Sequence, residues 1–294
     1  VERDLLAAPD SAAVEQRAGI MSGRAHLAVI LARGLGTRMR RDHDETELDA
    51  AQQAAAKHGR KAMMPVAGGR PFLDYILSSL ADAGLTQVCL VVAPDHEAMR
   101  DHFARHPTHR VTLDYVVQPE PTGTADAVLA AEAWTAGRDF IVLNGDNLYP
   151  VDALRALADL DEPGLVAFDR DTLIRDGNIA PERIQTFALL DVGPDGLLRQ
   201  LVEKPDEAEF ARLGGGSRGV SMNVWRFDRA IFQACRDVGL SARGERELSQ
   251  AAALAVTRGL RFRVLPIAAG VLDLSGRGDV EDVSRRLAGL EPAT

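Results

Sequence analysis

The 294-residue chain has little of what marks secreted, membrane or nucleic-acid-binding proteins. Its two cysteines, Cys89 and Cys235, lie far apart and fit no metal-binding or redox spacing, so we expect buried, reduced thiols in a cytoplasmic protein. No apolar run reaches the ~18 residues that a membrane-spanning helix needs. The formal net charge is −9 and there is no basic block, which argues against a nucleic-acid partner.

Residues 1–25 are not expected to be a signal peptide. Residues 1–25 are charged and have no apolar stretch of the kind found in signal peptides. We expect this segment to be an N-terminal extension. One domain is expected over residues 26–294, because no repeat, low-complexity tract or linker-like composition divides them. In so acidic a chain, an anionic ligand would need a local cluster of Arg and Lys side chains.

Apolar segments alternate with helical patterns along the chain. Strands are predicted at 27–32, 87–92, 111–117, 140–143, 164–168, 185–190, 197–202, 219–227 and 261–267, and helices at 71–83, 95–104, 124–134, 152–159 and 245–258. This alternation predicts an α/β fold with a mostly parallel sheet that is covered by helices on both faces. The turn signal Gly193-Pro194-Asp195-Gly196 lies between two apolar runs and predicts an antiparallel hairpin, which makes the sheet mixed.

A glycine-rich turn follows the first predicted strand. In Gly34-Leu35-Gly36-Thr37-Arg38, the glycines let backbone N–H groups approach an anion closely, and Arg38 can bind phosphate oxygens through its planar guanidinium. The segment matches neither the G-x-G-x-x-G dinucleotide motif nor the G-K-[ST] of a P-loop. By itself the turn is also compatible with a tight connection between a strand and a helix.

Residues 40–60 interrupt the alternation of strands and helices. Thr46-Glu47-Leu48-Asp49 precedes an alanine-rich stretch and predicts a capped helix inserted after the glycine turn. Its position beside a candidate phosphate loop suits a lid, and its composition suits a solvated surface helix at least as well. The sequence leaves both interpretations open.

The glycine turn forms a pair with Lys61-Ala62-Met63-Met64-Pro65. Together they resemble the sugar-1-phosphate nucleotidylyltransferase family, in which a Gly-x-Gly-Thr-Arg loop is followed by a Lys-x-x-x-Pro segment. The resemblance extends over roughly residues 26–280 and continues, in the family's order, through Gly69–Tyr75, Gln118-Pro119, Gly123–Ala127, Asn144–Asn147, Val202–Pro205, Ser221–Asn223, Ser241–Glu245 and Asp273. It implies a Rossmann-like three-layer nucleotidyltransferase fold.

The resemblance also implies a reaction: nucleotidyl transfer from a nucleoside triphosphate to a sugar 1-phosphate, with Mg²⁺ as cofactor and with a nucleotide sugar and pyrophosphate as products. The attacking phosphate oxygen is already mostly ionised near pH 7, because its second pKa is ~6, so no general base is required. Two alternatives stay open: a heptose, cyclitol or phospho-alcohol acceptor, and a non-catalytic subunit that senses nucleotides or sugar phosphates. The oligomeric state, including a homo-oligomer, also stays open.

Four residues are expected to perform the chemistry. Asp146 follows a predicted strand, so its carboxylate would lie at the carboxyl edge of the sheet, where open α/β sheets bind ligands. The resemblance pairs Asp146 with Asp273 as Mg²⁺ ligands, although residues 271–275 read Val-Leu-Asp-Leu-Ser where the family usually has Trp-x-Asp-x-Gly. It assigns Arg38 and Lys61 to the β- and γ-phosphates, which makes Arg38, Lys61 and Asp146 the catalytic residues.

The remaining motifs are assigned to the two substrates. The resemblance implies Leu31, Gly34, Gly36, Thr37, Gln118, Gly123 and Thr124 as nucleotide-binding residues, and Glu203, Lys204, Ser221 and Asn223 as sugar-phosphate-binding residues. Asn223 stands where ADP-glucose pyrophosphorylases have Gly, which argues against glucose 1-phosphate, whereas Ser241–Glu247 resembles glucose-1-phosphate thymidylyltransferases. Arg33 stands where relatives generally have a small residue, and would either add a phosphate contact or restrict the base.

Overall fold

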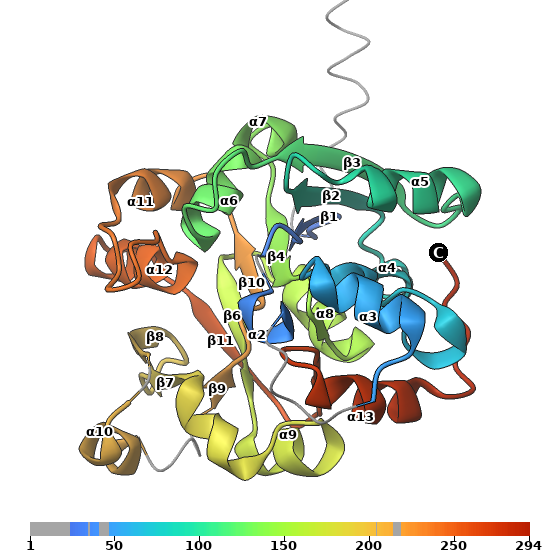
Figure 1. Ribbon diagram of the computed structural model, residues 1–294. Coiled ribbons are helices and arrows are strands. Elements are labelled where there is room, and N and C mark those ends of the chain that lie inside the picture. Colours follow the sequence, from blue (N-terminus) through green and yellow to red (C-terminus); the bar gives the residue numbers. More distant parts are fainter. Residues whose placement is uncertain (1–23, 35, 41–46, 204, 214–218) are drawn as a thin grey trace, which may run out of the picture.

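The computed structural model describes residues 24–34, 36–40, 47–203, 205–213 and 219–294, so most of the predicted N-terminal extension lies outside the described residues. Within these ranges a ten-stranded sheet has the order β3-β2-β1-β4-β10-β6-β9-β7-β8, with β11 beside β6 (Figure 1). The strands are β1 (Leu27–Leu31), β2 (Gln87–Val92), β3 (Thr112–Val117), β4 (Phe140–Asn144), β6 (Gly164–Phe168), β7 (Ala188–Val192), β8 (Leu198–Val202), β9 (Val220–Ser221), β10 (Trp225–Phe227) and β11 (Arg263–Ile267).

Seven of the ten strands in the described sheet run in one direction. β1 pairs in parallel with β2 and β4, and β2 with β3. β10 is antiparallel to both β4 and β6, which aligns β6 and its parallel neighbour β11 with the first four strands. β9 is antiparallel to β6 and β7, so β7 shares this direction, while β8, β9 and β10 oppose it. The predicted mixed, mostly parallel sheet is confirmed, as is the β7–β8 hairpin.

Helices cover both faces of this sheet (Figure 1). On one face lie α4 (Phe72–Asp82), α8 (Val151–Ala158) and α13 (Gly278–Leu287), and on the other lie α6 (Thr124–Ala130), α11 (Ile231–Asp237) and α12 (Leu248–Thr257). Alternation of side chains along each strand divides the core in the same way. In β1, Ala28 and Ile30 pack towards the first face, and Leu27 and Val29 towards the second. The expected three-layer α/β fold is confirmed.

The remaining described helices lie at the ends and edges of these layers. They are α2 (Thr37–Arg40), α3 (Ala50–Lys57), α5 (Glu97–Arg105), α7 (Glu132–Thr135), α9 (Arg170–Asp176) and α10 (Glu207–Arg212), with 3₁₀ turns at Lys61–Met63, Ala67–Gly69 and Pro181–Thr186. Among the described residues no helix has the length and apolar character to cross a membrane. Cys89 and Cys235 are buried free thiols as predicted, and burial raises the pKa of each to about 12.

Some predicted elements differ from the structure. The strand predicted at 219–227 is two strands, β9 and β10, because Asn223 between them has φ +58°, a left-handed conformation that interrupts an extended segment. The helix predicted at 124–134 is divided at Ala131 into α6 and α7. Helices α11 (seven residues) and α13 (ten residues) were not predicted from the sequence.

A second, two-stranded sheet was also not predicted, and it joins distant parts of the chain. β5 (Asn147–Leu148) and β12 (Leu272–Asp273) are antiparallel, with Asn147 opposite Asp273. The N–H of Leu274 donates to the carbonyl oxygen of Asp146 at 2.8 Å. The two aspartates predicted as metal ligands therefore lie on neighbouring backbone segments.

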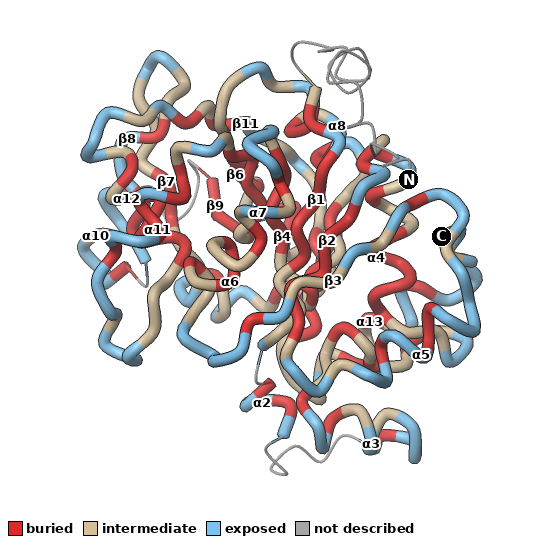
Figure 2. The backbone as a smooth tube through the Cα atoms, turned by 90° about the horizontal axis from the view of Figure 1, so that it is seen from above, coloured by how far each residue is buried: buried red, intermediate tan, exposed pale blue. Residues whose placement is uncertain are grey.

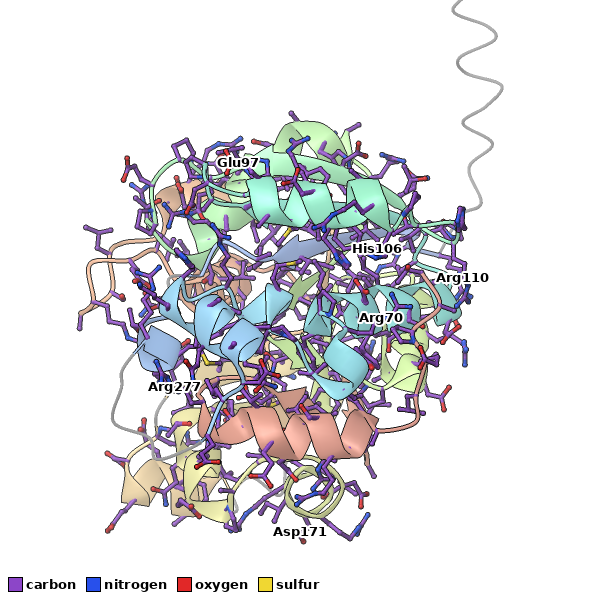
Figure 3. All side chains as sticks on the ribbon, turned by 45° about the vertical axis from the view of Figure 1, so that its right-hand side comes forward. Arg70, Glu97, His106, Arg110, Asp171 and Arg277 are labelled. Carbon is purple, nitrogen blue, oxygen red and sulfur yellow. The ribbon has the colours of Figure 1, made fainter. Side chains whose placement is uncertain are left out.

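The helix predicted within residues 40–60 is α3, although Thr46 lies outside the described residues. Its N-cap is Asp49, whose side chain accepts a hydrogen bond from the N–H of Gln52 while the Gln52 side chain accepts one from the N–H of Asp49. Figure 2 shows α2 and α3 at the periphery of the molecule. Arg277, labelled in Figure 3 just ahead of α13, donates from Nε to the carbonyl oxygen of Met39 at 2.9 Å and holds α2 against α13.

Candidate active cleft

A cleft of about 370 Å³ lies at the carboxyl ends of β1 and β4. Every residue predicted to be catalytic or to bind the nucleotide lines it: Leu31, Gly34, Gly36, Thr37, Arg38, Lys61, Gln118, Gly123, Thr124 and Asp146. Parallel strands bring these segments together, because their carboxyl ends meet at one edge of the sheet. The structure thus gathers in one cavity residues that lie far apart in the sequence.

Close backbone packing explains the glycines around this cleft. Gly36 has φ +57°, and a Cβ atom there would lie 2.4 Å from the carbonyl oxygen of Gly59. The N–H of Gly145 donates to the carbonyl oxygen of Leu31 at 3.0 Å, and a Cβ atom on Gly145 would lie 3.1 Å from that oxygen. A side chain is therefore excluded at Gly36, where the glycine turn meets the segment after α3, and is only tightly accommodated at Gly145, at the end of β4.

The three predicted catalytic residues differ in how they are held. The Nζ of Lys61 donates to Oδ2 of Asp146 at 2.9 Å, with the two side chains 19% and 26% exposed. Arg38 is exposed at the start of α2 and, among the described residues, has no hydrogen-bond or ion-pair partner. The cleft therefore contains one fixed lysine–aspartate pair and one arginine that is free to bind an anion.

Asp273 lies behind this pair and is not a lining residue of the cleft. Its Oδ1 accepts a hydrogen bond from Arg183 at 2.8 Å, and its Oδ2 accepts one from Nδ2 of Asn147 at 3.1 Å. Arg183 also contacts Asp279 at 3.3 Å. Burial lowers the pKa of Arg183, but the negative charges of Asp273 and Asp279 outweigh it, so the pKa is raised and the cation is secure. Arg183 was not predicted as a site residue, because no sequence motif marks it.

Tyr149 is influenced by the charges of both aspartates and donates a hydrogen bond at the break between β9 and β10. Its hydroxyl donates to the carbonyl oxygen of Met222 at 2.6 Å. Burial, reinforced by the negative charges of Asp146 and Asp273, holds the pKa of the Tyr149 phenol well above its usual range. Tyr149 is therefore a neutral hydrogen-bond donor that fixes the chain next to Asn223.

The loop before α12 forms one wall of the cleft. Gly123 has φ +120°, and a Cβ atom there would lie 2.3 Å from the carbonyl oxygen of Arg246. The N–H of Arg246 donates to the carbonyl oxygen of Thr122, and the N–H of Leu248 donates to the hydroxyl of Thr124, both at 2.8 Å. The predicted base-binding segment is therefore held in place by a distant part of the chain.

Two charged residues of this loop, Arg243 and Glu245, line the cleft and were not predicted as site residues. Both belong to the Ser241–Glu247 block that resembles glucose-1-phosphate thymidylyltransferases, and this resemblance could have marked them as site residues. Arg243 also lies 4.0 Å from Glu247, whose pKa is raised by burial. With Arg33 and Arg38, Arg243 is the third arginine that lines the cleft.

Gln118 and Arg33 stabilise the loops around the cleft. The Nε2 of Gln118 donates to the carbonyl oxygen of Gly123 at 3.0 Å and to Asp126 at 3.2 Å, so its amide nitrogen is used within the protein. Arg33 donates to the carbonyl oxygens of Gln118 and Pro119 at 3.1 and 3.0 Å. Arg33 therefore fastens the glycine turn to the predicted base-binding segment.

The described residues predicted to bind the sugar phosphate do not line the cleft that holds the predicted nucleotide-binding residues. Glu203 accepts a hydrogen bond from the hydroxyl of Ser249, Ser221 is buried, and neither they nor Asn223 line the cleft. Lys204 lies outside the described residues. Asn223 has a positive φ, and Asn and Gly are the residues that tolerate this left-handed backbone conformation best. The difference from Gly therefore does not by itself argue against glucose 1-phosphate.

Comparison with known proteins decides the family. The model of a family described as nucleotidyl transferase matches residues 55–266. The chain belongs to this family of enzymes. The resemblance inferred from the motifs is therefore confirmed.

Two curated relatives illustrate the range of this family. The bifunctional protein GlmU of Methanococcus vannielii is 29% identical over 224 residues, which are 76% of this chain and 46% of that protein. UTP–glucose-1-phosphate uridylyltransferase AglF of Haloferax volcanii is 26% identical over 264 residues, 88% of this chain and 96% of AglF. The chain spans about half the length of the first curated relatives that it matches, which are longer proteins.

Solved structures support the same fold. A UDP-glucose pyrophosphorylase complexed with UDP-glucose matches with a TM-score of 0.69 and 16% identity, covering 89% of this chain and 97% of that one. The inositol-1-phosphate CTP transferase from T. maritima matches with a TM-score of 0.67 and 18% identity, covering 91% and 96%. At these identities the likeness is one of fold.

Proposed function

We propose that this chain transfers a nucleotidyl group from a nucleoside triphosphate to a sugar 1-phosphate, releasing pyrophosphate, with Mg²⁺ as the cofactor. The observation that carries the proposal is the convergence of Arg38, Lys61 and Asp146 on the glycine turn in a single cleft. Relatives named as sugar-1-phosphate nucleotidylyltransferases, such as AglF, support the same class of reaction.

The residues of the cleft can perform this reaction by positioning and charge neutralisation. The backbone N–H groups of the glycine turn receive the triphosphate, and Arg38 neutralises the charge that develops on the leaving pyrophosphate. Lys61 is held at 2.9 Å from Asp146 and delivers a second positive charge to the same phosphates. The acceptor phosphate is its own nucleophile, so the absence of a histidine from the lining of the cleft is compatible with catalysis.

Asp146 and Asp273 are the residues that would hold Mg²⁺. The described residues contain no group of three or more His, Cys, Asp or Glu side chains arranged for a metal ion, so phosphate and water oxygens would have to complete the coordination, as Mg²⁺ prefers. Asp146 fits this role, because its carboxylate faces the cleft and only Oδ2 is paired with Lys61. Asp273 is almost fully buried, does not line the cleft and accepts hydrogen bonds from Arg183 and Asn147 on its two oxygens, so it would have to exchange one of these partners to hold the ion. When bound, the ion would supply Lewis-acid stabilisation of the phosphate oxygens.

A sugar phosphate is the acceptor class that we favour. Glu203 accepts one hydrogen bond from Ser249 and retains a second oxygen for an acceptor hydroxyl. One relative, 32% identical over 125 residues, is named as a heptose 1-phosphate guanylyltransferase. Sugar phosphates other than glucose 1-phosphate are therefore included among the candidate acceptors. A non-catalytic sensing role is less well supported, because Arg38, Lys61 and Asp146 are all present and converge.

The proposal is tested by measuring pyrophosphate release across a matrix of five nucleoside triphosphates and a panel of sugar 1-phosphates, with the inositol and heptose phosphates included. We expect release for at least one pair, dependent on both substrates and on Mg²⁺, and abolished by a chelator. Triphosphate binding without pyrophosphate release from any pair would favour the sensing role instead.

A further inference from the structure

A second cleft, of about 210 Å³, lies behind the glycine turn and is not used by the proposed reaction. It extends between the segment after α3 and the loop that joins β2 to α5. The two clefts share one wall, made of residues 32–34, Gly59 and Ala62, which line both. A ligand in the second cleft would therefore touch the back of the loop that receives the triphosphate in the first.

Positive charge gathers at the rim of this second cleft. Two arginines, Arg40 and Arg60, line it together with His58, and within the described part of the chain Asp95 is the acidic residue of the lining. Arg60 and Asp95 are 3.8 Å apart with side chains 34% and 77% exposed, so this pair is weak and leaves most guanidinium N–H groups of Arg60 available. Such a cluster is unexpected in a chain with a net charge of −9, whose overall field repels anions.

The donors at the rim are held close to one another. Arg40 donates from one guanidinium nitrogen to the carbonyl oxygen of His58 at 3.0 Å, which anchors its side chain and leaves its other N–H groups for a ligand. Among the described residues the imidazole of His58 has no hydrogen-bond partner. A phosphate group, which accepts several charge-assisted hydrogen bonds at once, matches this set of donors.

Apolar residues make up part of the lining of the second cleft, and its volume is small. They include Met63, Val92, Ala93, Pro94 and Met99. An apolar lining with a few polar donors is typical of small-molecule sites. At about 210 Å³, against about 370 Å³ for the first cleft, it suits a compact phosphate ester better than a nucleoside triphosphate.

This interpretation accounts for two sequence features that the transfer reaction leaves unexplained. The inserted segment 40–60 supplies Arg40, His58 and Arg60. Arg33, the unusual residue of the glycine turn, lies on the shared wall and donates to the carbonyl oxygen of Gln118 on the side of the first cleft. Contact across this wall gives the two clefts a physical connection.

We propose that the second cleft binds a small phosphorylated metabolite through Arg40, His58 and Arg60, and that its occupancy changes the affinity of the first cleft for a triphosphate. The binding step is independent of the proposed function, whereas the coupling rests on it. By linkage, the triphosphate must change the affinity for the metabolite by the same factor.

Isothermal titration calorimetry on the full chain tests the binding step, with inorganic phosphate and glycerol 3-phosphate as separate probes at matched ionic strength. We expect Arg60→Gln, and His58→Ala with it, to weaken binding about tenfold or more, since each removes a charge-assisted or polar contact. Lys57→Gln removes one positive charge from the same insertion without touching the cleft, and should change the Kd less than about twofold. Arg38→Gln separates the two clefts, because it removes an anion-binding residue of the first cleft and leaves the lining of the second unchanged.

The outcomes separate this proposal from the proposed function. If Arg38→Gln abolishes phosphate binding and Arg60→Gln does not, the probes occupy the first cleft, and the second site is overturned while nucleotidyl transfer stands. If both probes fail to bind the wild type, the second site is overturned as well. If binding depends on Arg60 while no triphosphate binds, the second site stands and the proposed function fails. A triphosphate Kd that glycerol 3-phosphate leaves unchanged in the wild type overturns the coupling.

Discussion

The nucleotide side and the sugar side of the molecule differ in how their residues come together. On the nucleotide side, parallel strands β1, β2 and β4 end at one edge, and all ten predicted residues line the cleft there. On the sugar side, antiparallel strands and short turns place Glu203, Ser221 and Asn223 outside its lining. Residues that directly follow parallel strands share an edge whatever their separation in sequence, whereas residues on antiparallel strands do not.

The two sides also differ in what fixes their side chains. Lys61 and Asp146 are held by each other, and Gly36 beside them is required by its φ of +57° and because a Cβ atom there would lie 2.4 Å from the carbonyl oxygen of Gly59. On the sugar side, Asn223 is set by its own backbone conformation and by the hydrogen bond from Tyr149 to its neighbour. Substitutions on the nucleotide side should therefore change turnover, and those on the sugar side should act more weakly.

The largest expected effect is that of Asp146→Asn. Losing the carboxylate removes a ligand for Mg²⁺ and the partner of Lys61, so turnover should fall about 10³-fold or more, the loss typical of a key electrostatic group. Steady-state pyrophosphate release measures this. Asp152→Asn, with its side chain 90% exposed at the start of α8, is the control and should keep wild-type turnover. Equal activity of the two variants would remove Asp146 from the mechanism.

The next effect is that of Arg38→Gln and of Lys61→Met. Each variant removes one positive charge from the triphosphate side, and turnover should fall about 10²-fold, with a smaller change in KM for the acceptor. Separate determination of kcat and of each KM distinguishes these effects, with Lys57→Gln as the charge-matched control. A change confined to the acceptor KM would assign the residue to the sugar side.

Gly123→Ala tests whether the loop before α12 is a rigid wall. A Cβ atom 2.3 Å from the carbonyl oxygen of Arg246, at φ +120°, should cost about 2 kcal/mol or more of unfolding free energy and weaken triphosphate binding. Urea unfolding and a binding titration measure the two. Gly137→Ala, with φ +75° and open space around it, should cost about 1 kcal/mol. Equal losses of unfolding free energy in the two variants would mean that the loop before α12 moves to accommodate the added Cβ atom.

Arg183→Gln sharpens the role of Asp273. Removing the guanidinium leaves the buried carboxylate of Asp273 and the half-buried one of Asp279 without this cation, and because Arg183 and Asp279 are partly exposed the cost should be about 1–2 kcal/mol of unfolding free energy. Mg²⁺ should raise the thermal midpoint of the variant more than that of the wild type if Asp273 is a ligand. Arg199→Gln breaks an exposed pair and should change stability by less than about 0.5 kcal/mol. An Mg²⁺ response equal to that of the wild type would argue against Asp273.

The smallest effect is expected for Asn223→Gly. Gly adopts the φ of +58° as readily as Asn, so unfolding free energy should change by less than about 1 kcal/mol. The ranking of acceptors in the pyrophosphate assay should also be preserved, because Asn223 does not line the cleft. A reordered ranking would return Asn223 to the acceptor site.

The sequence predicts well what depends on neighbouring residues. The apolar run at 27–32 and the glycines after it correctly predict β1 and the turn, because burial and φ are local demands. The two-residue strands β5 and β12 could not be predicted, since they exist only through pairing with each other. The partners of Asp273 depend on that pairing, and the role of Arg183 depends on it in turn.

The walls of the clefts show the same limit. Gly123 could be recognised from its motif, but its contact with Arg246 arises where α12 packs beside α6. Arg40 and Arg60 belong to a segment whose composition suited a lid or a surface helix, and only the fold brings them to one rim. Long-range packing therefore determined what the sequence had left open.

The fate of two isotopic labels tests nucleotidyl transfer most directly. The active triphosphate is labelled with ³²P at the α-phosphorus in one sample and at the γ-phosphorus in another, and the products are separated after reaction with the acceptor. We expect the α-label to enter the nucleotide sugar and the γ-label to enter pyrophosphate, and Asp146→Asn to form both products about 10³-fold more slowly. A γ-label on the acceptor, or an α-label in free nucleoside monophosphate, would contradict it.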